Sequence, residues 1–169
     1  MTASGTLRAS LIALLLAPSL ALAEGGMINA YQTVDVNLPA AEVWDRIRVF
    51  DGLAGWHPVF SEVVLLSGEN ESPGATRRLT VKDGPSFEEE LLELDDERMR
   101  LRYKIIGENE LPIDTYDSTI QVVKTGPGRS SVLWRGSFKA KPGNKDEDMI
   151  KFIEGVYRAG LDNLKRPVE

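Results

Sequence analysis

The sequence predicts an α+β fold in which an antiparallel sheet is closed by one long helix. Residues 146–166 form an amphipathic segment whose apolar positions recur every three or four residues, which is typical of a helix. The predicted apolar stripe consists of Met149, Ile150, Phe152, Ile153, Val156, Tyr157, Leu161 and Leu164. Residues 63–141 are expected to form strands separated by turns rich in Gly, Pro, Asn and Asp, with no helical pattern between them. A helix of about 20 residues is roughly 30 Å long. We expect it to bury its apolar stripe across the face of a curved sheet.

The remaining elements follow from local patterns. Residues 28–37 alternate apolar and polar side chains and are expected to form the opening strand. Residues 37–47 carry Pro39 in the first turn and an apolar face, which indicates a short helix, and 50–58 form a second short helical or irregular segment. The six further strands are expected at 63–66, 76–82, 87–94, 98–106, 113–124 and 131–141. With no repeat and no linker, residues 24–169 are expected to be a single domain.

Residues 1–23 are expected to be a signal peptide. Arg8 precedes the apolar run 11–17, and Ala21 and Ala23 supply the small residues that a signal peptidase requires before Glu24. The apolar run is too short to span a bilayer as a permanent helix. We expect a periplasmic protein cleaved after Ala23, with an uncleaved membrane anchor as the alternative.

Charge and cysteine content exclude several classes of function. The formal net charge is −6, and without residues 1–23 it becomes −7, because that segment removes one basic residue and leaves 26 acidic against 19 basic residues. Nucleic acids and anionic membranes are therefore not expected partners, whereas a basic protein is compatible. The chain has no cysteine, which excludes thiol chemistry and iron–sulfur ligation. No cofactor and no metal site are predicted.

Charge and alternation together predict how the middle strands pair. In 98–106, basic residues alternate with apolar ones, so the two kinds occupy opposite faces. A three-residue turn at 95–97 places Glu90 opposite Arg102 and matches apolar residues on the other face, an arrangement worth about 0.2–1 kcal/mol per charged pair. The same parity places Arg78 opposite Glu90. The inner face is then expected to carry Arg77, Leu79, Val81, Phe87, Glu89, Leu91, Leu101, Tyr103 and Ile105.

Several short motifs together resemble a known superfamily. They are VNLPAAEVWDRIRVFDGLAGWHP at 36–58, LDDER at 94–98, YKIIG at 103–107, YDST at 116–119 and the closing helix. The chain resembles the superfamily of polyketide cyclases, START lipid-transfer domains and the Bet v 1 allergen (SRPBCC) over nearly all of 28–166. The central and C-terminal segments resemble plant abscisic-acid receptors. With the export signal, the chain is most similar to the periplasmic MxaD-type proteins associated with bacterial methanol oxidation.

The resemblance implies a helix-grip fold, with a seven-stranded antiparallel sheet around the C-terminal helix and a cavity between them. It implies ligand-binding positions at Ser61, Phe87, Glu89, Tyr103, Ile105, Tyr116, Ser118, Trp134, Phe152, Val156 and Gly160, and the inward register adds Arg77, Leu79 and Val81. The gate loop of the receptors is shortened here to 83–85, and other residues replace their latch around 110–112. The lysine that anchors their ligand's carboxylate is matched by Ser61. Hormone binding is therefore not expected.

Few residues are candidates for chemistry. His57 is the only histidine, and its place beside Trp56 and Pro58 indicates a packing or capping role. Glu89 is expected on the inner face, where a charge requires a partner, and Arg77, placed diagonally on the neighbouring strand, is the candidate. The alternative is a solvated carboxylate at the open end of the cavity.

The preferred function is a non-catalytic one: binding an apolar or amphipathic small molecule, or acting as an accessory factor to a redox system such as methanol dehydrogenase or its cytochrome. One alternative is an enzyme of the cyclase or dehydratase kind that uses Glu89, Tyr103 and Tyr116 as acid–base groups. Another is an interaction module with a collapsed cavity.

Overall fold

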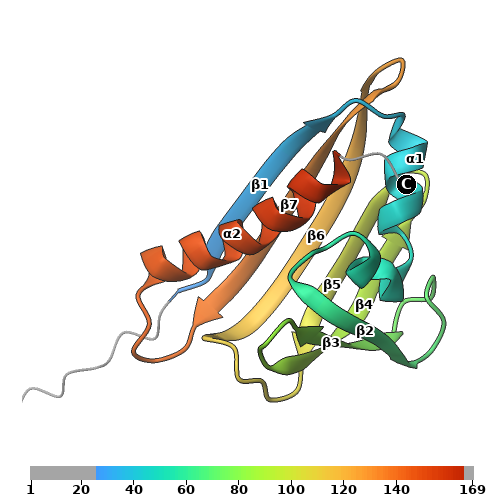
Figure 1. Ribbon diagram of the computed structural model, residues 1–169. Coiled ribbons are helices and arrows are strands. Elements are labelled where there is room, and N and C mark those ends of the chain that lie inside the picture. Colours follow the sequence, from blue (N-terminus) through green and yellow to red (C-terminus); the bar gives the residue numbers. More distant parts are fainter. Residues whose placement is uncertain (1–25, 166–169) are drawn as a thin grey trace, which may run out of the picture.

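The computed structural model describes residues 26–165, which form a seven-stranded antiparallel sheet with a long helix across one face (Figure 1). The strands are β1 (Ile28–Val36), β2 (Phe60–Ser67), β3 (Thr76–Val81), β4 (Ser86–Asp95), β5 (Arg100–Ile106), β6 (Ile113–Gly126) and β7 (Arg129–Ala140). Their order in the sheet is β1-β7-β6-β5-β4-β3-β2, so β1 and β2 are the edge strands. The predicted helix-grip fold is confirmed. The predicted signal peptide lies outside the described residues.

The long helix α2 (Asp146–Leu164) buries one stripe of its surface against the sheet and runs along β1 and β7 (Figure 1). The buried apolar residues follow one another at intervals of three or four residues, and they are Met149, Ile153, Tyr157, Leu161 and Leu164. Each such burial contributes about 1.5–3 kcal/mol relative to exposure. The predicted stripe is broader than the buried one, since it includes Phe152, whose side chain is 42% exposed.

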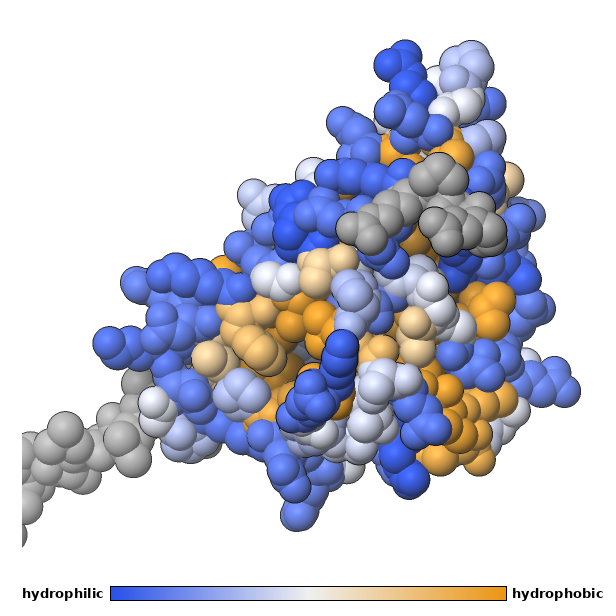
Figure 2. Space-filling model, viewed as in Figure 1, coloured by the Kyte–Doolittle hydropathy of each residue, from blue (hydrophilic) through white to orange (hydrophobic). Residues whose placement is uncertain are grey.

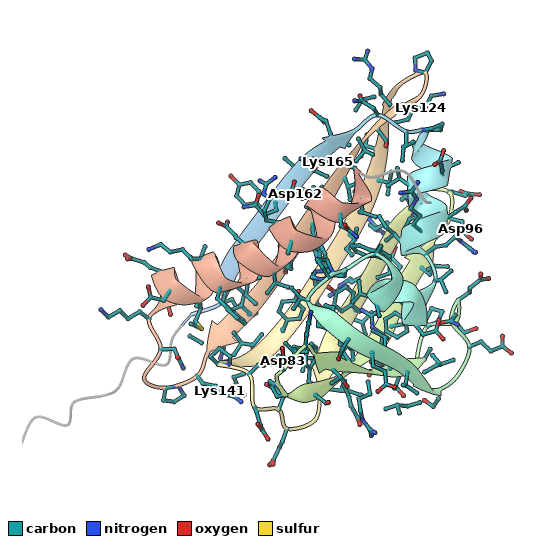
Figure 3. The ribbon with its side chains drawn as sticks, in the orientation of Figure 1. Asp83, Asp96, Lys124, Lys141, Asp162 and Lys165 are labelled. Carbon is teal, nitrogen blue, oxygen red and sulfur yellow. The ribbon has the colours of Figure 1, made fainter. Side chains whose placement is uncertain are left out.

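Two short helices close the side of the curved sheet that α2 leaves open. Helix α1 (Ala40–Ile47) contacts β6 and β7, and the 3-10 helix η1 (Phe50–Gly55) contacts β2. Beyond α1, Arg48 donates two hydrogen bonds of 2.9 Å to Asp96 in the turn between β4 and β5, and Trp44 Nε1 donates a third of 2.7 Å. Asp96 thus ties α1 to the far end of the sheet (Figure 3).

The predicted register of the middle strands is wrong by two residues. Glu90 lies opposite Lys104 rather than Arg102, and Arg78 lies opposite Glu88 rather than Glu90. The observed partners form ion pairs, with Lys104 Nζ 3.0 Å from a Glu90 oxygen and Arg78 Nη2 2.8 Å from a Glu88 oxygen. Since β4 carries several acidic residues and β5 carries a basic residue at every second position, a two-residue shift exchanges one set of ion pairs for another.

The turn between β4 and β5 accounts for the shift. It occupies four residues, 96–99, and Met99 adopts a positive φ of 48°. A bulge at Leu92 then absorbs one further residue of β4. Because a shift of two residues preserves which side chains point inward, the predicted inner face survives. All nine of its residues are buried or half-buried.

No helix within residues 26–165 combines the length and the apolar character needed to cross a membrane.

Candidate functional site

A cavity of about 350 Å³ lies between the inner face of the sheet and α2. Strands β2 to β7 and α2 supply its walls, and η1, the segment after it, the turn before β4 and the loop before β6 supply the remainder. Figure 2 shows apolar side chains gathered and the surface hollowed between α2 and the strands β2 and β3. The hollow is the opening of a space enclosed by sheet and helix together.

Nine of the fourteen predicted ligand-binding residues line this cavity. They are Val81, Phe87, Glu89, Tyr103, Ile105, Tyr116, Trp134, Phe152 and Val156. The strand residues face inward because side chains alternate across the sheet, and the helix residues face back toward them. Whether these residues bind a ligand stays a prediction.

The other five predicted residues do not belong to the cavity wall. Ser61 is exposed on β2, where its hydroxyl donates a 3.3 Å hydrogen bond to a backbone carbonyl. Arg77, Leu79 and Ser118 are buried without lining the cavity. Gly160 is buried where α2 passes the only histidine. Four of the five are therefore buried outside the cavity lining, and whether any of the five takes part in ligand binding stays a prediction.

Ten lining residues were not predicted, and they are Leu53, Val59, Phe60, Pro85, Glu110, Leu111, Pro112, Ile113, Ile153 and Tyr157. The sequence pattern could have identified Ile153 and Tyr157, since both belong to the apolar stripe of the closing helix, which faces the sheet. Most of the others come from η1 and from loops, where no periodicity in the sequence sets the direction of a side chain.

Glu89 and Arg77 form a buried ion pair at the cavity. They lie directly opposite each other on β4 and β3, rather than diagonally as expected, and each is 3% exposed. Arg77 Nε and Nη2 donate to the same Glu89 oxygen, Oε2, at 2.8 and 2.5 Å. The alternative of a solvated carboxylate at the open end is therefore wrong.

The Arg77 guanidinium is also held by its other neighbours. Its Nη1 donates to the Phe50 carbonyl, and its carbon lies 4.0 Å from the centre of the Phe50 ring and 5.2 Å from that of Tyr103. Burial raises the pKa of Glu89, and the charge and hydrogen bonds of Arg77 work against that rise. The two charges compensate each other inside the wall, and the hydrogen bonds of Arg77 go to Glu89 and Phe50.

Three tyrosines, a serine and a tryptophan form a hydrogen-bonded cluster along the cavity. Tyr116 Oη lies 2.7 Å from Tyr157 Oη and 3.5 Å from Tyr103 Oη. Trp134 Nε1 donates to Tyr103 Oη at 3.1 Å and to Ser118 Oγ at 3.0 Å. The close approach of Tyr157 to β7 requires Gly136, whose added Cβ would lie 2.2 Å from Tyr157 Oη.

The tyrosine hydroxyls are proton donors rather than bases at neutral pH. Burial raises the pKa of Tyr103 to about 12, and the charge of Glu89 adds to the rise. Burial also raises the pKa values of Tyr116 and Tyr157, and neighbouring tyrosines add to the effect. These groups can therefore orient an acceptor by hydrogen bonding, but they do not supply a phenolate.

His57 packs in the core beneath α2. Its side chain is fully buried, lies edge-on to Trp134 with ring centres 5.6 Å apart, and accepts a 3.3 Å hydrogen bond from the Val59 backbone at Nδ1. Burial lowers its pKa to about 4, and the charge of Arg77 adds to the fall. The imidazole is neutral and does not line the cavity, which agrees with the predicted packing role.

The cavity wall offers no metal site and no free cation. Within residues 26–165, no three side chains of His, Cys, Asp or Glu converge to hold a metal ion. The charged residues described in the lining are both acidic, Glu89 and Glu110. Glu89 is already paired, and Glu110 is exposed at the mouth.

A larger groove of about 660 Å³ lies on the outer face of the sheet, but it is a less suitable site. Its charged residues largely pair with each other, as in the bonds of Arg100 to Glu93 and of Arg102 to Asp117. It has no second layer of structure above it, since α2 covers the other face. The inner cavity is therefore the candidate site.

Proteins similar to this chain include a plant receptor and bacterial proteins. Abscisic acid receptor PYL2 of Arabidopsis thaliana is 29% identical over 140 residues, which cover 78% of this chain and 73% of the receptor. The structure of protein XoxI from Bacillus cereus superposes with a TM-score of 0.74 at 27% identity and covers 82% of this chain and 93% of that one. A protein from Thermobifida fusca gives 0.73 at 28% identity, with 81% and 90% covered.

The match to a family extends over the whole described domain. Residues 27–169 match the family described as polyketide cyclase / dehydrase and lipid transport. This match includes every strand, both α-helices and all residues that line the cavity. The chain belongs to the polyketide cyclase / dehydrase and lipid transport family.

Proposed function

We propose that the protein binds a small apolar or amphipathic molecule in the cavity between the sheet and α2 and does not transform it. The composition of the cavity carries this proposal: its wall is mostly aliphatic and aromatic, with a few hydroxyls, one paired charge and one exposed acidic residue. Small-molecule sites usually have this make-up, and about 350 Å³ lies near the lower end of their size range. Such a volume does not fit an interaction module with a collapsed interior.

Binding is preferred to catalysis because two of the candidate acid–base groups, the tyrosines, do not accept protons near neutral pH, and the third, Glu89, is held in a buried ion pair. Raised pKa values keep Tyr103 and Tyr116 protonated. Glu89 accepts two hydrogen bonds from Arg77 at one carboxylate oxygen, Oε2, and these bonds hold it in the ion pair. A cyclase or dehydratase needs a group that alternates between proton donor and acceptor near neutral pH.

A cavity-filling variant tests binding. Uncharged N-phenyl-1-naphthylamine is expected to gain fluorescence with the wild type, and Val156→Phe is expected to weaken that binding because the larger ring occupies the cavity. Val64→Phe is the matched control, since Val64 is 44% exposed on β2 and does not line the cavity. Melting temperatures check that both variants fold. If the two variants bind the probe equally, or if the wild type does not bind it, the proposal is wrong.

We also propose that the protein acts in the periplasm as an accessory factor of a redox system such as methanol oxidation. The N-terminal segment 1–23 and the resemblance to MxaD-type proteins support this role, as does the acidic charge of the remaining chain. Mass spectrometry of the periplasmic fraction is expected to find a chain beginning at Glu24. A full-length chain retained in the membrane would instead support the uncleaved anchor.

A further inference from the structure

Two groups determine which hydroxyls donate and which accept in the tyrosine cluster. Trp134 Nε1 can only donate, and it donates to Tyr103 Oη at 3.1 Å and Ser118 Oγ at 3.0 Å. The Arg135 carbonyl can only accept, and it takes the single hydrogen of the Ser118 hydroxyl at 2.9 Å. Ser118 therefore has no hydrogen left for any other partner.

One arrangement gives every remaining contact a hydrogen. Tyr157 donates to Ser118 at 3.4 Å, Tyr116 donates to Tyr157 at 2.7 Å, and Tyr103 donates to Tyr116 at 3.5 Å. The last contact is the longest and lies at the limit for a hydrogen bond. Tyr103 thus begins the chain of donors, and its hydrogen is the least committed in the cluster.

Tyr103 is placed to give that hydrogen to a ligand. Its side chain lines the cavity, and its oxygen already accepts from Trp134. A hydroxyl that accepts one hydrogen bond becomes a better donor of its own hydrogen, because such bonds polarise one another. In a cavity with a mostly apolar wall, this donor favours a ligand that carries an acceptor atom in reach.

The charges of the wall determine which kind of acceptor fits. None of the described lining residues is Lys or Arg, and the nearby Arg77 gives its hydrogen bonds to Glu89 and to the Phe50 carbonyl. A ligand carboxylate would lose its water without gaining a counter-ion, and it would face two acidic residues, Glu89 and Glu110. An uncharged oxygen acceptor loses far less on entering.

We propose that the cavity selects an uncharged ligand bearing a carbonyl oxygen, and that Tyr103 is the residue that recognises this oxygen by donating a hydrogen bond to it. This inference rests on the proposed binding function and narrows it from apolar or amphipathic molecules in general to neutral carbonyl compounds. Fatty acids and other carboxylates are excluded as preferred ligands.

Three probes of one shape separate these classes. In 2-acetylnaphthalene the acetyl group offers a carbonyl oxygen, in 2-isopropenylnaphthalene a CH₂ group replaces that oxygen, and in 2-naphthoate a carboxylate takes its place. Calorimetry is expected to rank the affinities of the wild type as ketone, then alkene, then carboxylate. The carbonyl stretch of the bound ketone is expected at lower frequency than in an alkane solvent, because it accepts a hydrogen bond.

Two variants assign the donor. Tyr103→Phe is expected to lower the ratio of ketone to alkene affinity by roughly three- to tenfold, the worth of one neutral hydrogen bond, and to return the carbonyl stretch toward its value in alkane. The variant should fold, because Trp134 Nε1 keeps its bond to Ser118. Tyr116→Phe removes the internal acceptor of the Tyr103 hydrogen and is expected to raise the same ratio.

The outcomes distinguish this inference from the function on which it rests. If the alkene binds as tightly as the ketone, or the carboxylate binds best, the cavity binds ligands but the selection for a neutral carbonyl is wrong. If Tyr116→Phe, and not Tyr103→Phe, abolishes the preference, the direction of the hydrogen bonds is the reverse of that proposed. If no probe binds the wild type, the binding function fails together with this inference.

Discussion

Arg77 and Glu89 depend on each other because both charges are withdrawn from water. Removing one partner leaves the other buried and unpaired, which costs more than the pair itself contributes. The pair also joins β3 to β4 and holds η1 through the Phe50 carbonyl. It is therefore expected to stabilise the wall of the cavity rather than to bind the ligand directly.

The variant Glu89→Gln tests this dependence. It keeps the shape and removes the charge, so the unfolding free energy is expected to fall by about 3–5 kcal/mol in urea denaturation. The double variant Arg77→Met/Glu89→Leu is expected to recover most of the loss, since an apolar pair of similar size needs no compensation. Glu90→Ala is the control, because Glu90 pairs with Lys104 at the surface and its loss should cost at most about 1 kcal/mol. An unchanged stability in Glu89→Gln would mean that the charge is not buried in solution.

His57 should make the stability of the protein depend on pH. Burial lowers its pKa to about 4 in the folded chain, against an ordinary value of 6.5, so the unfolded chain takes up the proton first as the pH falls. The stability is then fully present above pH 6.5 and is lost toward pH 4. Between pH 8 and pH 5 the loss is expected to be about 2 kcal/mol.

The variant His57→Leu isolates this contribution. Urea denaturation of the wild type and of the variant at pH 8, 7, 6 and 5 gives two curves of stability against pH. The curves should diverge below pH 6.5, with the wild type losing stability faster, because the variant has no imidazole to protonate. Parallel curves would show that His57 is accessible to protons in the folded protein.

The helix α2 carries two glycines in different surroundings. At Gly160, an added Cβ would lie 2.4 Å from His57 Cδ2 and 3.1 Å from Trp56, whereas at Gly155 it would meet nothing within 4 Å. The sequence indicates that both weaken the helix and suggests a close approach of the backbone to what lies beneath at both positions. The structure shows that Gly160 is required where α2 crosses the segment after η1.

Alanine at the two positions is expected to act in opposite directions. Gly160→Ala forces the rings of His57 and Trp56 to move and should lower the melting temperature, by an amount equivalent to about 1–3 kcal/mol. Gly155→Ala gains helix propensity without a clash and should raise the stability by up to about 1 kcal/mol. Thermal unfolding followed by circular dichroism measures both. Destabilisation of equal size at the two positions would contradict the packing described for Gly160.

The charge of the whole molecule bears on its partners. A net charge of −7 after removal of 1–23 should steer encounters with a basic protein, and such steering weakens with salt. Association with methanol dehydrogenase or its cytochrome is therefore expected to slow markedly between about 10 mM and 150 mM salt, where the Debye length falls from about 30 to 8 Å. Surface plasmon resonance measures the association rate. Binding that does not change with salt, or no binding, would count against the accessory role.

The sequence by itself determined the fold class, the order of the elements and the inward face of the middle strands. These properties depend on hydrophobic periodicity, which is local. Apolar residues recur every three or four positions in 146–166, as in a helix, and at every second position in 98–106, as in a strand. The direct pairing of Arg77 with Glu89, the two-residue shift of β4 against β5 and the cluster around Tyr103 were decided only by the tertiary structure. Several registers satisfy alternating charges almost equally, and a four-residue turn with a bulge selects among them. Likewise, no local pattern brings Trp134 of β7 and Tyr157 of α2 to Tyr103 of β5, because only the packing of sheet against helix does so.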